Sequence, residues 1–258
     1  MNIGAFRWGR RAAADRAAVE LLVAPQATGN IVTFARAPKT VDEIVASRIK
    51  HLTGYQNAAL AERYRALVDR VRAIEQRDIP GQTALAEAVA RNYAKLLAYK
   101  DEYEVARLFT EAGFAAQLGS QFEGDFRLKF HLAPPLFAAR DPKTGHLLKQ
   151  EFGPWMLQAF RLLARFKALR GTAFDPFGYT AERKQEQALI REYEGLIDEL
   201  LTSLSLVNHS LAVKLAAIPE DIRGYGHVKE SHLVKARHKW DDLLVQWRNP
   251  AVLKQAAE

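Results

Sequence analysis

Apolar residues recur at helical spacing along most of the chain, and this periodicity constrains the fold more than any other feature of the sequence. Leu189, Tyr193 and Leu196, for example, form part of one helical stripe. Thr40 and Glu43 have the spacing of a capping box, which is typical of a helix start. We predict helices that begin near Asp15, Thr40, Thr83, Pro154, Thr180, Asn208 and Lys229, with stops at Pro25, Pro80-Gly81, Gly113, Gly171 and Pro219.

The helix predicted from Thr83 to Gly113 is the longest of these, and its two faces have different chemistry. Tyr99 and Tyr103 share one face, which we expect to pack in the core. Lys100 and Glu104 have the (i, i+4) spacing of a surface ion pair. The short connection at Pro80-Gly81 predicts that this helix packs antiparallel to the one before it.

Alternation of apolar and polar residues replaces helical spacing over residues 126–132. Residues 141–145 have the composition of a turn, and residues 147–152 form a second, weaker strand. The sequence therefore predicts a β-hairpin at about 125–153. Because an isolated hairpin is marginal in water, its apolar face must lie on helices or on another chain.

The predicted fold is mainly α-helical, with this one hairpin inserted. The ordinary composition, with 48% hydrophobic and 26% charged residues, supports a folded chain. We expect a single domain over residues 1–258, with a helical half at 1–120 and a half at 121–258 that combines the hairpin with further helices.

The sequence contains few groups that could carry chemistry. It has no cysteine, which excludes disulfides, thiolate nucleophiles and cysteine-ligated iron–sulfur or zinc sites. It has no Walker A, GxGxxG, HExxH, GxSxG or EF-hand pattern, and no two of its seven histidines are four residues apart. We therefore predict no catalytic residue and no metal ligand, and expect the histidines to lie at the surface or at helix caps.

The N-terminal residues do not resemble a signal peptide, and no run of 18 uncharged apolar residues occurs. A cytoplasmic protein without a membrane span is expected.

Charge is distributed unevenly along the chain. The net charge is +7, with +5 over residues 121–170 and −4 over residues 171–220. We favour complementarity within the molecule or between domains, and an anion-binding surface is the alternative. The basic residues are too dispersed to favour nucleic-acid binding, although the high pI leaves it as a weaker alternative.

Two groups of residues are candidate anion-binding sites. In the first, Gly224 and Gly226 would let the backbone approach a ligand at a helix start, and His227 and Lys229 would add donors; a simple glycine-rich turn is the alternative. The second lies on the polar face of the first strand, for which a solvated edge is the alternative. Its members are Arg127, Lys129 and His131.

Several segments of the sequence carry a family resemblance. They are FRWGR from Phe6, LAYKDEYEVARLFT from Leu97, the long run from Phe122 to Arg183, and PEDIRGYGHVKE from Pro219. Together they resemble the C-terminal region of the long, single-chain indolepyruvate ferredoxin oxidoreductases, a region usually described as a domain of unknown function. The resemblance covers essentially the whole chain.

The resemblance implies membership in an assembly that oxidatively decarboxylates aryl pyruvates to acyl-CoA and passes the electrons to ferredoxin. Thiamine diphosphate and iron–sulfur clusters do that chemistry. Their binding elements lie N-terminal to the region seen here, so no catalytic residue transfers to this sequence. The chain is then expected to be a fragment, a truncated reading frame or a separate subunit.

The resemblance therefore implies an accessory domain that binds no cofactor by itself and is not catalytic alone. It would pack on the catalytic domains or subunits, organise them or cover their active site, and meet ferredoxin only indirectly. A helical module that binds an anion such as the phosphates of CoA is the alternative.

Overall fold

The computed structural model describes residues 3–23, 40–121, 127–133 and 148–249, and it divides into two units, residues 1–37 and 38–258. The first unit contains α1 (Ile3–Ala14) and α2 (Arg16–Val23). Asp15 accepts a hydrogen bond from the Ala18 amide, so the predicted start at Asp15 is confirmed. The sequence analysis did not predict α1, and none of the residues of α1 is buried.

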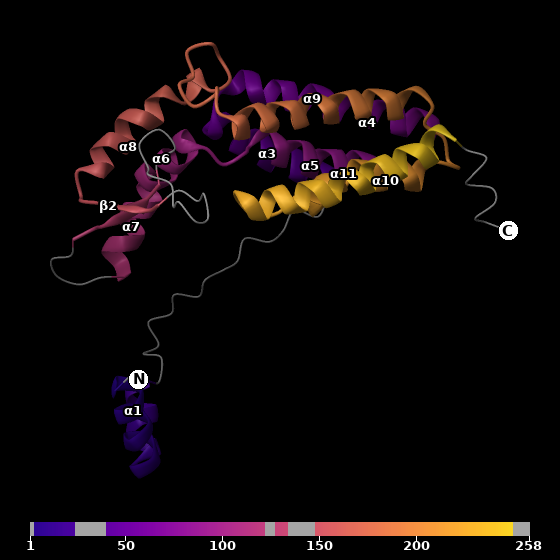
Figure 1. Cartoon of the computed structure of the whole chain (residues 1–258). Helices are drawn as coiled ribbons and strands as arrows, with labels where there is room; N and C mark the ends of the chain where they lie inside the picture. Colours follow the sequence, from indigo (N-terminus) through magenta and orange to yellow (C-terminus); the bar gives the residue numbers. More distant parts are fainter. Residues whose placement is uncertain (1–2, 24–39, 122–126, 134–147, 250–258) are drawn as a thin grey trace. The chain divides into compact units, whose positions relative to one another are not determined.

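The second unit is built around a bundle of helices with one continuous core. Its members are α3 (Val41–Tyr55), α4 (Ala58–Asp78), α5 (Ala84–Leu97), α9 (Ala181–Thr202), α10 (His209–Ala216), the short 3-10 helix η2 (Ile218–Asp221) and α11 (His227–Arg248). These helices run roughly alongside one another (Figure 1). The α5 helix contacts α3, α4, α9, α10 and η2, so it lies at the centre of the bundle.

Three tyrosines form the middle of this core. Tyr64, Tyr93 and Tyr193 come from α4, α5 and α9, and their rings are stacked with centroids 6.1 Å apart in each pair. All three rings are fully buried. Their hydroxyl groups donate to the carbonyls of Ala90 and Ala216 and to the Glu194 carboxylate, so that no phenol is buried without a partner.

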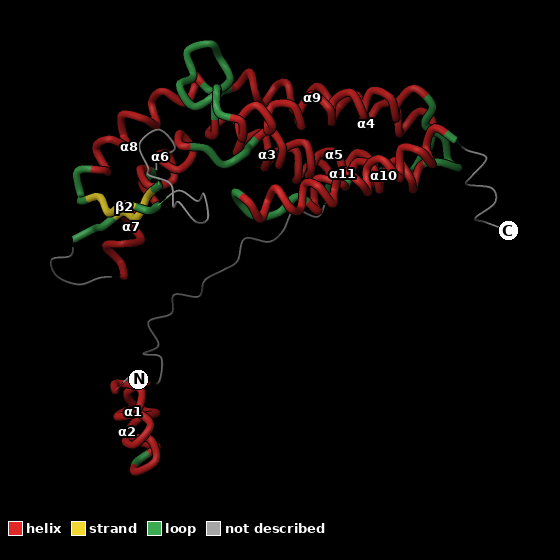
Figure 2. Tube along the Cα trace, in the orientation of Figure 1, coloured by secondary structure: helices red, strands yellow, loops and turns green. Residues whose placement is uncertain are grey.

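A smaller module follows the bundle's first three helices. It contains α6 (Glu102–Thr110), α7 (Ala112–Gln121), β1 (Phe130–Leu132), β2 (Gln150–Phe152), α8 (Met156–Arg165) and the 3-10 helix η1 (Phe166–Leu169). Figure 2 shows the two strands beside the helices of this module. The strands pair antiparallel, with His131 opposite Glu151. Phe130 packs with Met156 and Phe160 of α8 in a separate small core.

The structure confirms a mainly helical fold with one inserted hairpin. The alternation over β1 is also confirmed, because Phe130 is buried while His131 is exposed. The predicted turn at 141–145 lies outside the described residues. The capping box is present, with the Thr40 hydroxyl accepting from the Glu43 amide and the Glu43 carboxylate accepting from the Thr40 amide.

The single helix predicted from Thr83 to Gly113 is wrong. The chain leaves the helix at Ala98, and Asp101 begins α6 by accepting a hydrogen bond from the Glu104 amide at 2.8 Å. The apolar spacing continues across this break, so periodicity did not reveal it. Tyr99 and Tyr103 are buried as predicted.

The predicted Lys100–Glu104 pair is also wrong. Lys100 lies over the ring of Tyr225, with 4.3 Å between its amine and the ring centroid, and Glu104 is buried against Arg107 instead.

The acidic helix α9 shows how the uneven charge is accommodated. Its carboxylates pair with basic residues of α4 on one side and of α11 on the other. The pairs are Arg63–Glu194, Arg70–Asp198, Lys229–Glu186, Arg237–Glu192 and Arg248–Glu199. The acidic helix is therefore complemented within the molecule, but its partners come from α4 and α11 and not from the described part of residues 121–170.

Among the described residues, no helix combines the length and apolar character that a bilayer crossing requires.

Candidate functional site

Of the predicted cationic face of the first strand, only His131 lies within β1, whereas Arg127 and Lys129 precede the strand, and part of the charge is neutralised. Arg127, Lys129 and His131 are all exposed. The Lys129 amine lies 2.8 Å from a Glu151 carboxylate oxygen. The hydrogen bond from Lys129 lowers the pKa of Glu151, and the charges of Lys129 and His131 add to this effect. This face therefore offers a paired lysine and only two further donors to a ligand.

The glycine turn before α11 has the geometry that the sequence predicts. Gly224 and Gly226 have φ angles of +86° and +55°, in the region where glycine is favoured. A Cβ atom on Gly224 would lie 2.7 Å from a methyl group of Val228. The side chain of His227 lies outside the described residues, and its predicted role stays untested.

Lys229 faces inward from this turn and pairs with Glu186 of α9. The ring of Tyr225, in the same turn, contacts the amine of Lys100, which lies in the connection between α5 and α6. The candidate residues at 224–229 therefore lie where three segments converge that are far apart in the sequence. No hydrogen bond or ion pair within the described parts of the chain joins them to the candidates on β1.

Several cations gather near this convergence. Burial lowers the pKa of Lys95, and the positive charges of Arg223 and Lys229 lower it further. The Lys95 amine donates to the carbonyl of Pro219 at 2.6 Å. Three cations therefore lie close together beside the start of α11, although Glu186 pairs with Lys229 and the charges of Glu220 and Asp221 raise the pKa of Lys95.

A buried ion pair with imperfect geometry joins α9 to α6. Arg183 and Glu102 are 3.9 Å apart at their closest charged atoms. The Arg183 Nη1 and the Glu102 Oε2 atoms are buried and have no hydrogen-bond partner. Burial raises the pKa of Glu102, and the charge of Arg183 offsets this only in part. Neither residue was predicted from the sequence to be a functional candidate.

Arg170 joins the small module to the bundle. Its guanidinium makes two hydrogen bonds to Asp101, at 2.5 and 2.8 Å, and a third to the Tyr55 carbonyl at 2.8 Å. It also lies 3.6 Å from the centroid of the Tyr55 ring. Both charged side chains are only 2% exposed, so this pair is a structural joint that no small ligand can reach.

Glu75 and His209 form a second buried structural pair. The Glu75 carboxylate accepts from the amides of Leu85 and Ala86 at the start of α5, at 2.8 and 2.9 Å. A His209 ring nitrogen lies 2.7 Å from the same carboxylate. The prediction that histidines lie at the surface or at caps is therefore wrong for His209. This residue is buried against Glu75, whose carboxylate accepts from the first amides of α5.

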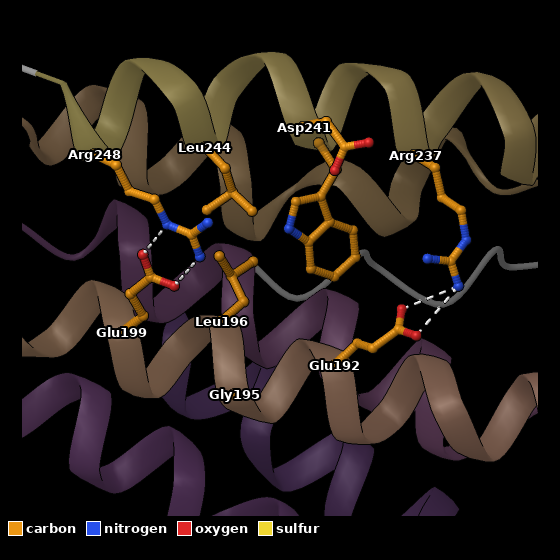
Figure 3. Close-up of a pocket in the computed structure, with 9 residues that line it drawn as sticks. Glu192, Gly195, Leu196, Glu199, Arg237, Asp241, Leu244 and Arg248 are labelled. Atoms are coloured by element: carbon orange, nitrogen blue, oxygen red, sulfur yellow. Dashed lines mark hydrogen bonds and ion pairs between the residues drawn. The ribbon is translucent and has the colours of Figure 1, made fainter.

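A groove of about 310 Å³ runs between α9 and α11 (Figure 3). Two ion pairs bridge it, Arg237–Glu192 and Arg248–Glu199. Leu196 and Leu244 lie between these pairs, and Gly195 leaves space on the α9 side. Four of the charged residues that line the groove are therefore paired with one another, whereas Asp241 has no ion pair among the described residues.

The solvent-facing side of α8 is the most unusual surface of the small module. Met156 and Phe160 point into the small core, whereas Trp155, Leu162 and Phe166 are exposed. Within the described ranges, no three His, Asp or Glu side chains gather into a metal site. The arrangement defines a helical protein with ion pairs across its bundle and with apolar side chains exposed on α8.

Comparison with known proteins identifies the family. The chain belongs to a family of unknown function, DUF6537, whose model matches residues 41–242. No curated protein and no solved structure matches it.

Proposed function

We propose that this chain is an accessory domain of a thiamine-diphosphate-dependent 2-oxoacid:ferredoxin oxidoreductase that acts on indolepyruvate or related aryl pyruvates. In this proposal it packs on the catalytic domains and organises them or covers their active site. Thiamine diphosphate and the iron–sulfur clusters belong to those domains, and ferredoxin meets them rather than this chain. The resemblance of the run from Phe122 to Arg183 to that enzyme family supports the proposal.

The location of exposed apolar side chains carries the proposal. Six of the large ones fall between residues 148 and 179, inside the run that carries the resemblance. They are Leu148, Trp155, Leu162, Phe166, Phe174 and Tyr179. Exposed apolar residues that share a surface, as Trp155, Leu162 and Phe166 do on α8, often mark a protein interface. A segment that resembles part of a large enzyme and exposes such residues is suited to dock on the rest of that enzyme.

Reconstitution tests this role. Catalytic domains of an indolepyruvate ferredoxin oxidoreductase that lack this region are mixed with the purified chain, with thiamine diphosphate and CoA supplied. We expect the chain alone to give no aryl-pyruvate-dependent reduction of ferredoxin, and the mixture to form a complex with a higher rate or greater stability than the catalytic domains alone. Turnover by the isolated chain, or failure to form a complex, would contradict the proposal.

A second candidate function is binding of an anion such as a CoA phosphate at the start of α11. The concentration of Lys95, Arg223 and Lys229 there favours it. Calorimetry with CoA tests it directly. Binding heat should be lost in Lys229→Ala and retained in Arg127→Ala, because Arg127 lies on the separate strand face. An unmodified chain that gives no heat would eliminate this candidate.

A further inference from the structure

We propose that the solvent face of α8 and η1 is the docking surface, and that it binds a protein partner whose apolar patch is rimmed by carboxylates. The face consists of Trp155, Leu162 and Phe166, with the exposed Arg161 and Arg165 to one side of them. The inference rests on the proposed function in taking the catalytic domains as that partner, and it adds which surface binds and what chemistry it recognises.

Helical geometry places the three apolar residues in one line. Leu162 and Phe166 follow Trp155 by seven and eleven positions, which brings all three to the same side at 3.6 residues per turn. Their exposed fractions are 60% for Trp155, 57% for Leu162 and 47% for Phe166. The three side chains therefore lie along one side of α8 and the start of η1 and face solvent.

The opposite side of α8 is already occupied. Met156 and Phe160 are buried there, and Phe109 of α6 stacks on the Phe160 ring at 5.4 Å. Figure 1 shows α8 at the edge of its unit, with α6 and the strands on its inner side. Rotating α8 to cover the exposed stripe would empty the small core, so the stripe stays available to another molecule.

Charge indicates the chemistry of that partner. No acidic residue occurs between Gly153 and Phe174, a stretch that includes four basic residues. Within the described residues, Arg161 has only a hydrogen bond to Gln158 at 3.2 Å, and Arg165 has no ion pair. The basic residues that face α9, in contrast, are paired with its carboxylates. Unpaired arginines beside apolar residues suit a surface that supplies the missing carboxylates.

Two other occupants fit these observations less well. A nucleic acid would require more cations along the face than two arginines, and a central aliphatic residue such as Leu162 contributes no stacking. A membrane would require a helix that can sink its apolar side into the bilayer, but the most apolar side of α8 is buried in the protein. Both remain measurable outcomes of the test.

The test measures the affinity of the full chain for the catalytic domains, with two variants of the face. Leu162→Glu should weaken binding by roughly thirtyfold or more, as expected at the centre of an interface. Arg161→Glu combined with Arg165→Glu should weaken it by about tenfold or more, and binding by the unmodified chain should weaken as salt is raised.

Two control variants introduce glutamate in place of an exposed leucine or arginine outside α8. Leu206→Glu alters a leucine that is 72% exposed on the loop between α9 and α10, and Arg191→Glu alters an exposed arginine of α9. Both should bind as the unmodified chain does. Circular dichroism and the melting temperature of each variant show whether it is folded.

The outcomes separate the two proposals. Binding that the α8 variants leave unchanged overturns the docking surface and leaves the accessory role standing. An unmodified chain that fails to bind the catalytic domains overturns both. Binding of the same face to duplex DNA or to anionic phosphatidylserine vesicles, abolished by Leu162→Glu, would contradict a carboxylate-rimmed protein partner.

Discussion

Burial decides the behaviour of the charged residues near the start of α9. Glu102 lies beside Arg183, yet its pKa is raised because the loss of solvation outweighs the attraction of the guanidinium. Two of the atoms in this pair have no hydrogen-bond partner. Ionisation of Glu102 in the folded protein therefore costs stability at neutral pH, as is common for a buried carboxylate in an imperfect ion pair.

Replacing Glu102 tests this directly. A folded pKa above the ordinary value of 4.5 means that the folded protein binds the proton more tightly than the unfolded chain, so stability falls as the pH rises from about 4.5 through the folded pKa. Glu102→Gln should therefore be more stable than the unmodified chain at pH 7 and equally stable below pH 4. Urea unfolding at both pH values measures this.

The exposed Glu182, in the first turn of the same helix, provides the control. Glu182→Gln should show no gain at pH 7, since it relieves no buried charge. A loss of stability in Glu102→Gln at pH 7 would show that attraction to Arg183 outweighs burial.

The pair formed by Arg170 and Asp101, unlike the pair formed by Arg183 and Glu102, should stabilise the folded protein. Both side chains are almost fully buried, and three hydrogen bonds satisfy the guanidinium. Asp101→Asn keeps a side chain that can cap α6 but leaves the arginine charge buried and unpaired. We expect a loss of about 3–5 kcal/mol in the free energy of unfolding.

A surface pair supplies the comparison. Asp198 pairs with Arg70, and both side chains are half exposed. Asp198→Asn should cost about 1 kcal/mol or less. Equal losses in the two variants would show that burial does not strengthen the contribution of the pair formed by Arg170 and Asp101.

At the level of single elements, the turn before α11 depends on glycine. Gly224 has a positive φ, and a Cβ atom there would overlap Val228. Gly224→Ala should therefore cost at least about 1 kcal/mol, measured by urea unfolding. Gly195→Ala is the matched control, because Gly195 is within α9 and has open space around it. That change should stabilise the protein by about 0.5–1 kcal/mol. A harmless Gly224→Ala would remove the conformational argument for this turn.

The elements also show what could be predicted from the sequence. Periodicity located the helices of the bundle and the hairpin, because each buries one face and the spacing of apolar residues records which face it is. The break at Ala98 escaped prediction because the apolar stripe passes through it in phase. It is stabilised by Asp101, whose partner Arg170 is 69 positions away, and no local pattern reveals such a contact.

For the candidate sites, too, local features could be predicted from the sequence and distant contacts could not. The glycine turn at 224–226 was predicted, since its signal is local, and so was the exposed face of β1. The partners of Lys229 and Lys129 were not predicted, because they come from α9 and from the other strand. The stripe on α8 was visible as apolar residues in the sequence, but only the structure shows that Met156 and Phe160 face the core while Trp155 and Leu162 face solvent.

At the level of the whole molecule, the second unit pairs the acidic α9 with basic residues on two sides but leaves the arginines of α8 unpaired within the described residues. Six of its large exposed apolar side chains lie in the run from Phe122 to Arg183. This distribution of charge and of apolar surface supports the proposal that the domain docks on a protein partner.

Hydrogen exchange tests this central claim most directly. The full chain is labelled with and without the catalytic domains of an indolepyruvate ferredoxin oxidoreductase, and exchange is compared for peptides that cover α8 and η1 and for peptides that cover α4. Added catalytic domains should slow exchange in the peptides of α8 and η1 and leave those of α4 unchanged. Exchange that is the same everywhere, or protection confined to other elements, would contradict the account.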